Sequence, residues 1–168
     1  MTHKTSREEY EQLQEIIRSK DYAKAKEKLK ELLKKEPENV IFLLDMAYVL
    51  GNMSEDEEAI KNYEKVIDIA PTNPSGYAGI GFIHRKNGET QKAIEYFQKS
   101  LEHDPSNTMV HFELGEVYFE ADDYESAKQQ YVKAVQFSED DDSEAESMHR
   151  IIQTELGMEQ LDKAIGHA

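Results

Sequence analysis

The side chains in this sequence with the capacity for catalysis are carboxylates and histidines, since the chain has 35 acidic residues, six histidines and no cysteine. Carboxylates stand in runs such as Asp56–Glu58 and Asp140–Asp142. A carboxylate pair works as general acid and base only where a pocket shifts its pKa. These runs fall at expected turns and helix starts, where acids favour the positive end of the helix dipole. The sequence therefore predicts no catalytic residue and a protein that is not an enzyme.

The arrangement of the other reactive side chains also argues against a metal or a cofactor. Without cysteine the chain has no thiolate nucleophile and no zinc-finger ligands. The acidic runs lack the spaced oxygen ligands and central glycine of a calcium loop, and the glycines are scattered singly rather than gathered in a phosphate-binding loop. The histidines show no HExxH spacing; they are His3, His84, His103, His111, His149 and His167.

Charge and composition narrow the class of protein. The chain has 168 residues with 20 basic side chains, a net charge of −15, and 38% hydrophobic residues. Such an acidic chain repels a phosphate backbone, so we expect no nucleic-acid partner. No apolar run reaches the roughly 18 residues that a membrane helix needs, and the N-terminus lacks the apolar stretch of a signal peptide. These features favour an acidic, cytoplasmic protein with no membrane partner.

Four columns of residues recur with a spacing of 34. A repeat of this length indicates that each unit is one supersecondary element stacked on the next. The columns are Pro37, Pro71 and Pro105; Ala25, Ala59, Ala93 and Ala127; Leu29, Tyr63, Phe97 and Tyr131; and Ala47, Gly81 and Gly115.

Two apolar patterns of helical period lie in each unit, separated by a polar break. The breaks are Ser19–Asp21, Met53–Glu55, Asn87–Glu89 and Ala121–Asp123. Helix starts are predicted from capping-box spacings and from a cap followed by proline. The pairs are Ser6 with Glu9, Ser54 with Glu57, Ser143 with Glu146, and Asn73 with Pro74.

These columns resemble the tetratricopeptide repeat (TPR) family, whose 34-residue motif has a small residue, an aromatic, an alanine, a second aromatic and a proline at the matching positions. The resemblance implies an all-α fold, a right-handed superhelical solenoid of stacked antiparallel helix hairpins. It divides the single domain 1–168 into repeats 6–39, 40–73, 74–107 and 108–141. The departures are local: Leu13 and Ile16 in the first repeat, and Glu139 in place of proline in the fourth.

Residues 142–168 continue the pattern imperfectly. We expect a degenerate fifth hairpin or capping helices, with an apolar stripe formed by Met148, Ile151, Ile152 and Leu156 and a helix break at Gly157. A terminal repeat caps the array with a more polar outer face. A peptide-like arm that docks elsewhere is the alternative.

In the family, first helices of successive repeats line a concave groove that binds partners, and the matching positions here are unusually apolar. His84 and His111 stand where packing aromatics are expected, so we expect them to be partly buried. Apolar groove residues suit an interface, although packing between hairpins or under the C-terminal cap would also explain them. The predicted partner-binding residues are Tyr10, Leu44, Tyr48, Ala78, Phe82, Arg85, Lys86, Met109, Phe112, Glu116 and Phe119.

The charge of the groove predicts the character of the partner. Some family members hold the C-terminal carboxylate of Hsp70 or Hsp90 with Lys, Asn and Arg side chains, but in every three-repeat frame the corresponding positions here lack those cations. The fourth repeat has 2 basic and 9 acidic residues. We therefore expect an apolar peptide or helical segment with basic flanks, while Arg85 and Lys86 form the basic pair that would accept one acidic group.

The leading hypothesis is a protein-binding adaptor that uses the groove. A structural self-assembly scaffold that uses the C-terminal helices to form homo-oligomers is the alternative. A regulatory domain cut from a longer protein is a third possibility, against which a start at Met1 with little preamble argues mildly.

Overall fold

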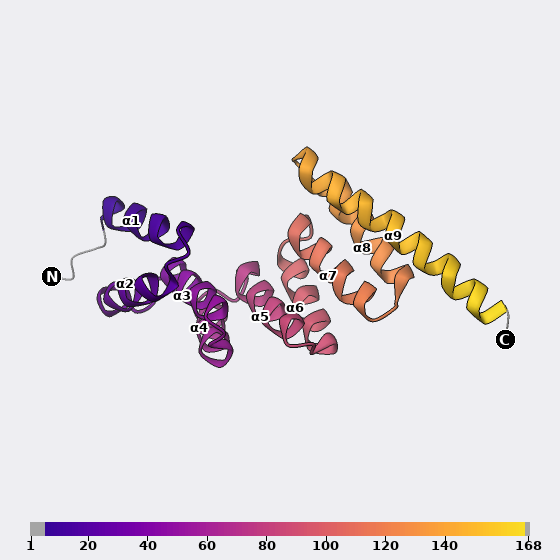
Figure 1. The fold of residues 1–168 in the computed structure, drawn as a ribbon. Coiled ribbons are helices and arrows are strands. Elements are labelled where there is room, and N and C mark those ends of the chain that lie inside the picture. The colour runs from indigo at the N-terminus through magenta and orange to yellow at the C-terminus, as the bar shows by residue number, and fades with distance from the viewer. Residues whose placement is uncertain (1–5, 167–168) are drawn as a thin grey trace. The chain divides into compact units, whose positions relative to one another are not determined.

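The computed structural model describes residues 6–166, and every regular element in that range is an α-helix (Figure 1). Among these helices none combines the length and the apolar character that crossing a membrane requires. Contacts divide the chain into two compact bodies, an N-terminal body of residues Met1–Ile83 and a C-terminal body of residues His84–Ala168.

The N-terminal body contains two helix pairs and most of a fifth helix, and consecutive helices from α1 to α4 pack against one another. The first pair lies within the expected first repeat and the second within the expected second. The helices are α1 (Arg7–Arg18), α2 (Tyr22–Lys35), α3 (Val40–Asn52), α4 (Asp56–Ile69) and α5 (Pro74–Lys86).

The C-terminal body contains the last residues of α5 and four further helices. Helix α7 packs on α6 and α8, and α9 packs along α8. The helices are α6 (Thr90–His103), α7 (Thr108–Glu120), α8 (Tyr124–Phe137) and α9 (Asp141–Gly166).

Two of the predicted helix starts are confirmed. The Ser6 hydroxyl accepts from the Glu9 N–H, and the Glu9 carboxylate accepts from the Ser6 N–H, which is a complete capping box. Helix α5 begins at Pro74, and the Asn73 side chain accepts from the Ser75 N–H. In both places a side-chain oxygen satisfies an N–H that the first helical turn leaves without a partner.

The other two predicted starts are wrong. Helix α4 begins at Asp56 after Glu55, and Ser54 lies in the preceding turn with a φ of 60° rather than in the extended conformation of an N-cap. Helix α9 begins before Ser143, whose N–H donates to the Asp140 carboxylate at 2.7 Å. In each case the spacing of a capping box is present, but the turn geometry places the first helical residue elsewhere.

The turns inside the four hairpins share one backbone conformation. Lys20, Ser54, Gly88 and Asp122 have φ values of 61°, 60°, 71° and 58° and are spaced 34 residues apart. This left-handed conformation ends a helix by satisfying its last carbonyl groups, but it costs an L-residue roughly 1–2 kcal/mol that glycine avoids. The third hairpin alone has glycine there, so the other three turns are strained.

We expect Ser54→Gly to raise the free energy of unfolding by about 0.5–1 kcal/mol, because glycine adopts the left-handed conformation without strain. Gly88→Ala should lower it by about 1 kcal/mol for the reverse reason. Urea denaturation followed by circular dichroism measures both changes. Ser54→Ala is the matched control: if it stabilises the protein as much as Ser54→Gly, the effect comes from the serine side chain and not from φ.

Helix packing, both within a hairpin and between successive hairpins, depends on small residues facing large ones. Ala25, Ala59, Ala93 and Ala127 are fully buried. A Cβ added to Gly79 would lie 2.2 Å from the Tyr63 ring, and one added to Gly115 would lie 2.6 Å from the Tyr131 ring. Both distances are shorter than any ordinary contact, so the close packing of these helices requires glycine.

The expected helix break at Gly157 is wrong, because α9 runs as one helix of 26 residues through this position. In place of a fifth hairpin or an arm that docks elsewhere, a single helix packs on α8, in the position expected of a C-terminal capping helix. A Cβ on Gly157 would lie 3.1 Å from the Tyr124 ring. The glycine serves close packing against α8, and its modest helix penalty of about 1 kcal/mol does not interrupt a long helix.

Candidate protein-interaction surface

One face of α3 carries a line of side chains that the hairpin does not use for packing. Ile41, Leu44, Asp45 and Tyr48 follow the i, i+3, i+4, i+7 spacing that places residues on one side of a helix. Ile41 is 52% exposed and Tyr48 is 50% exposed, whereas Leu44 is half-buried. We call these four residues the α3 face.

Asp45 is the charged member of the α3 face, and it is poorly solvated. Its carboxylate accepts from the Gln14 amide of α1 at 2.9 Å. Burial raises the pKa of Asp45 to about 6, although the Gln14 hydrogen bond opposes the shift. Burial, with smaller contributions from Tyr48 and Asp45, raises the pKa of Tyr63 to about 12. The centre of the α3 face is thus a half-buried polar group between exposed apolar ones.

Beside Ile41, a small open hollow of about 160 Å³ lies between the starts of α1 and α3. Tyr10 and Phe42 line it, and their rings meet at a centroid distance of 6.1 Å. The volume is below the roughly 300 Å³ at which small-molecule sites begin. It suits one side chain of a partner better than a substrate.

The raised pKa of Asp45 predicts a pH-dependent stability. Between about pH 4 and pH 6 the folded state binds more protons than the unfolded state, so stability falls as the pH rises through this window. We expect Asp45→Asn to remove this fall and to stabilise the protein at pH 7.5 by about 1–2 kcal/mol. That is less than the full two-unit shift implies, because part of the carboxyl faces water.

Chemical denaturation at pH 4 and pH 7.5 measures the difference. The exposed Asp68→Asn in α4 is the control, and the two variants should differ at pH 7.5 and agree at pH 4. An equal response of the two variants at both pH values would contradict the burial of Asp45.

Helix α7 carries the equivalent face in the C-terminal body, with a different chemistry. Met109 is 62% exposed and Phe112 is half-buried. The remaining positions are carboxylates, and we call Met109, Phe112, Glu113, Glu116 and Glu120 the α7 face. The helical spacing is the same as in α3 and Glu113 matches Asp45, but Glu116 stands where the α3 face has Tyr48.

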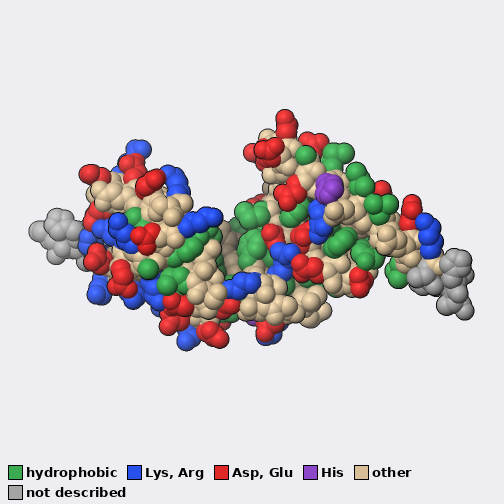
Figure 2. Space-filling view, in the orientation of Figure 1, with side chains coloured by type: hydrophobic (Ala, Val, Ile, Leu, Met, Phe, Trp, Pro, Cys, Tyr) green, Lys and Arg blue, Asp and Glu red, His purple; other side chains and the backbone are tan. Residues whose placement is uncertain are grey.

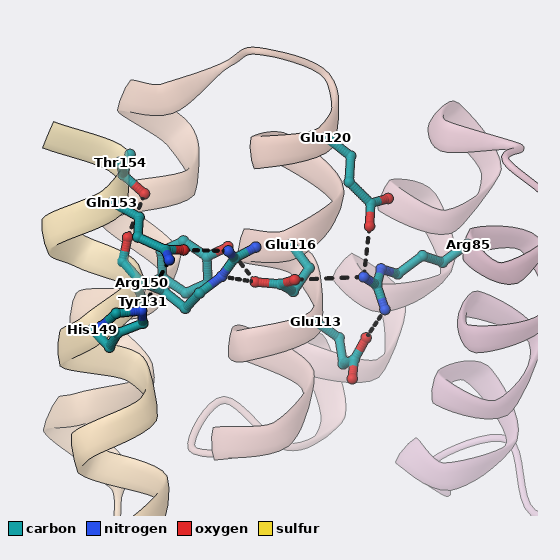
Figure 3. A network of polar contacts seen from close by, with 9 residues as sticks. All are labelled: Arg85, Glu113, Glu116, Glu120, Tyr131, His149, Arg150, Gln153 and Thr154. Carbon is teal, nitrogen blue, oxygen red and sulfur yellow. Dashed lines mark hydrogen bonds and ion pairs between the residues drawn. The ribbon is translucent and has the colours of Figure 1, made fainter. Parts of the chain in front are cut away.

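Arg85, near the end of α5, neutralises the α7 face (Figure 3). Its guanidinium lies 2.8 Å from Glu113, 2.6 Å from Glu120 and 3.6 Å from Glu116. Burial raises the pKa of Glu113 although the Arg85 charge opposes it. Three carboxylates of its own chain thus surround Arg85, and its predicted role in accepting an acidic group of a partner stays a prediction.

Arg150 of α9 approaches Glu116 from the opposite side (Figure 3). Its Nε donates to Glu116 Oε1 at 2.5 Å, and its guanidinium lies 4.4 Å from the centroid of the Phe119 ring. The Tyr131 hydroxyl donates to the same Glu116 oxygen at 2.6 Å. Burial and then this hydrogen bond raise the pKa of Tyr131. One carboxylate therefore links α7, α8 and α9, and a second arginine covers part of the α7 face.

We expect Arg150→Leu to lower the free energy of unfolding by about 2–3 kcal/mol, because it leaves Glu116, only 14% exposed, with one cation fewer. Combined with Glu116→Gln, the loss should be at least about 1 kcal/mol smaller than the sum of the two single losses. Urea denaturation of the four proteins gives this coupling energy. Additive losses would show that the pair does not hold α9.

The structure distributes the predicted groove residues over three levels of exposure. Ala78 is only 8% exposed and offers no surface to a partner. Tyr48, Lys86 and Met109 are exposed. The half-buried residues are Tyr10, Leu44, Phe82, Arg85, Phe112, Glu116 and Phe119. The continuity of this strip from one body to the other stays a prediction.

Sequence reasoning missed Arg150. A signal for it exists: Arg150 stands 34 residues after Glu116, so it occupies the ninth position of a fifth repeat, which is a groove position. With a helix break expected at Gly157, the apolar residues of this segment are predicted to form its packing side, and Arg150 is given no role.

The two histidines expected among the packing aromatics are buried, which confirms that prediction. His84 is 9% exposed and stacks on Tyr96 at 5.5 Å, and His111 is 3% exposed and stacks on Phe137 at 5.7 Å. His111 Nε2 donates to the Pro105 carbonyl at 3.0 Å. Within residues 6–166, no three His, Asp or Glu side chains gather in a way that would hold a metal ion.

Comparison with protein families agrees with the geometry. Residues 74–107 match a tetratricopeptide repeat model and coincide with the expected third repeat. Residues 53–88 match a TPR repeat model, and residues 96–129 match a further tetratricopeptide repeat model. Helix hairpins of this length, in phase over the array, define a repeat protein of the solenoid class. The chain belongs to the tetratricopeptide repeat family.

No protein of curated function matches the chain in sequence. Solved structures do match it in fold. A crystal structure of MamA is 21% identical, with a TM-score of 0.72 over 92% of this chain and 82% of that one. A tetratricopeptide repeat protein from Parabacteroides merdae is 18% identical, with a TM-score of 0.70 over 95% and 64% of the two chains.

The Sgt2 TPR domain from Aspergillus fumigatus is 22% identical, with a TM-score of 0.65 over 74% of this chain and 82% of that domain. These likenesses show an all-α tetratricopeptide solenoid. Proteins of this fold are typically non-catalytic interaction or scaffold modules.

Proposed function

We propose that the chain is a non-enzymatic adaptor that binds a peptide or helical segment of another protein on the groove faces of its first helices. The observation that carries this proposal is the α3 face. Single exposed apolar residues are normal on a protein surface, but Ile41 and Tyr48 are aligned on one helix face and each is about half exposed. Aligned exposed apolar side chains favour an interaction site.

The charges around the two faces favour a partner segment with apolar side chains and basic flanks. Asp45 lies between Ile41 and Tyr48, and the α7 face contributes Glu113, Glu116 and Glu120. Arg85 and Arg150 already bind these three glutamates, at distances from 2.5 to 3.6 Å. Guanidinium groups of the chain itself thus show which chemistry the α7 face accepts, and a net charge of −15 also attracts a basic segment.

The same charges argue against a partner that presents a C-terminal carboxylate. The α3 face has no cation, and the arginines beside the α7 face are engaged by glutamates. A free carboxylate at either face would meet like charge, which costs affinity. The proposed partner therefore inserts apolar side chains and presents Lys or Arg rather than a terminal carboxylate.

A peptide-display selection on the full chain tests the proposal. We expect the wild type to enrich peptides that combine Leu, Ile, Met or aromatic residues with Lys or Arg at the edges. The variant Ile41→Ala/Tyr48→Ala should lose at least about tenfold in affinity for the enriched peptides, since each truncation removes exposed apolar contact area. Fluorescence polarisation with the enriched peptides measures the loss.

Ile69→Ala is the matched control, because Ile69 is 42% exposed on α4, outside the two faces. It should bind like the wild type. Circular dichroism shows that both variants fold. Equal binding by all three proteins, or enrichment of acidic peptides, would overturn the proposal.

A further inference from the structure

Helix α9 buries polar side chains against its own chain. Against α8 it buries Ser147, which is 1% exposed, and Thr154, which is 0% exposed. The Ser147 hydroxyl is buried with no hydrogen-bond partner. Arg150 and Gly157 lie on the same side of the helix and make the contacts to Glu116 and Tyr124. The side of α9 that faces its own chain thus combines these polar residues with the half-buried Ile151 and Met158.

A line of large apolar side chains on α9 faces outward. Met148, Ile152 and Leu156 follow one another at i, i+4 and i+8, and they are 51%, 56% and 52% exposed. Figure 2 shows apolar side chains gathered along the part of the molecule that α9 forms. We call these three residues the α9 stripe. In the first, second and fourth repeats a second helix packs on the first, but α9 continues straight through residue 157 and no second helix covers the stripe within the described chain.

We propose that the α9 stripe binds the α9 stripe of a second copy of this chain, with the two helices antiparallel and centred on Ile152. In this arrangement residues whose numbers add up to 304 lie opposite each other. Met148 then packs against Leu156 of the second copy, and the two Ile152 side chains meet at the two-fold axis. Isologous pairing of this kind is the commonest form of protein dimer.

Charges along α9 favour this arrangement. At about 100° per residue, Asp141 and Lys163 lie on the same side of the helix as the stripe, and their numbers also add up to 304. His149 and Glu155 flank the stripe on its two sides and form a second such pair. In both pairs an acidic residue faces a basic one; within its own chain, Glu155 also lies 2.7 Å from Lys128 of α8, and Lys163 lies 3.8 Å from Glu159. In a parallel pair, Asp141 would face Asp141 and Glu155 would face Glu155, and like charges directly opposite repel.

The contact predicts a dimer that depends on concentration. Helix α9 has 26 residues, which is about 39 Å of helix at 1.5 Å per residue, but its stripe supplies only three large apolar side chains. Stable dimers usually bury about 1,200 Å² or more. The proposal is independent of the groove faces on α3 and α7, so either proposal can fail alone.

Cysteine crosslinking tests the orientation, because the wild-type chain has no cysteine. Under mild oxidation, Ile152→Cys alone should form a disulfide-linked dimer. A mixture of Met148→Cys with Leu156→Cys should form the heterodimer, whereas each of these two variants alone should stay largely monomeric. Crosslinking of Met148→Cys with itself would overturn the antiparallel arrangement. Absence of crosslinking by Ile152→Cys would overturn the proposal.

Sedimentation equilibrium over a range of concentrations tests the interaction itself. The wild type should shift from one to two chain masses as concentration rises, and Ile152→Glu should remain a monomer. Ile69→Glu is the control for an added acid at an exposed isoleucine and should dimerise like the wild type. A wild type of constant monomer mass, or a dimer that persists in Ile152→Glu, would overturn the proposal.

A charge exchange separates the self-pairing of α9 from the binding of a different helix. Asp141→Lys should weaken the dimer about tenfold, because each dimer contains two pairs with Lys163. Asp141→Lys/Lys163→Glu should recover most of that loss, since the exchanged charges again face opposite ones. Failure of the double variant to recover would mean that the two residues do not face each other.

Discussion

The rest of the structure depends on the close approach of helices at small residues. Four alanines, one in each repeat, are fully buried, Gly79 of α5 leaves room for the Tyr63 ring of α4, and Gly115 of α7 leaves room for the Tyr131 ring of α8. Where two helices pack this closely, the side of each helix that faces the other is buried. Because protein interiors are packed to crystal-like density, a methyl group at either glycine would clash with the facing ring. The close helix contacts therefore determine which side chains stay on the surface, where a partner can reach them.

The side chains on the surface of the first helix of a repeat differ between the two bodies. The α3 face retains exposed Ile41 and Tyr48 around a half-buried Asp45, whereas the α7 face is acidic and is held by Arg85 and Arg150. An uncompensated cluster of three carboxylates would repel itself, and two arginines from neighbouring helices remove that repulsion. One backbone arrangement thus gives an open surface in the first case and an internally neutralised surface in the second.

The sequence was sufficient for the features that repeat and insufficient for those that do not. Columns 34 residues apart predicted the helix pairs and the four turns, because the same packing problem recurs at each of them. The capping signal at Ser54 failed, since the left-handed turn there competes with an N-cap for the same residue. The role of Arg85 was missed because its three partners come from α7, and long-range ion pairs leave no periodic trace. Gly157 was misread because a glycine that breaks a helix and one that permits close packing look alike in sequence.

Helix α9 ends the array, so one of its sides has no neighbouring repeat to pack against. A terminal repeat ordinarily presents polar side chains to water, and α9 has them, but Ser147 and Thr154 are turned inward instead. The orientation of α9 follows from Arg150, which reaches Glu116 and the Phe119 ring only when this polar side faces the body. Turning the helix to bury Met148, Ile152 and Leu156 would take Arg150 away from a carboxylate that is 14% exposed. The ion pair at Glu116, together with the half-buried Ile151 and Met158 on the same side, therefore favours the orientation that leaves Met148, Ile152 and Leu156 outside.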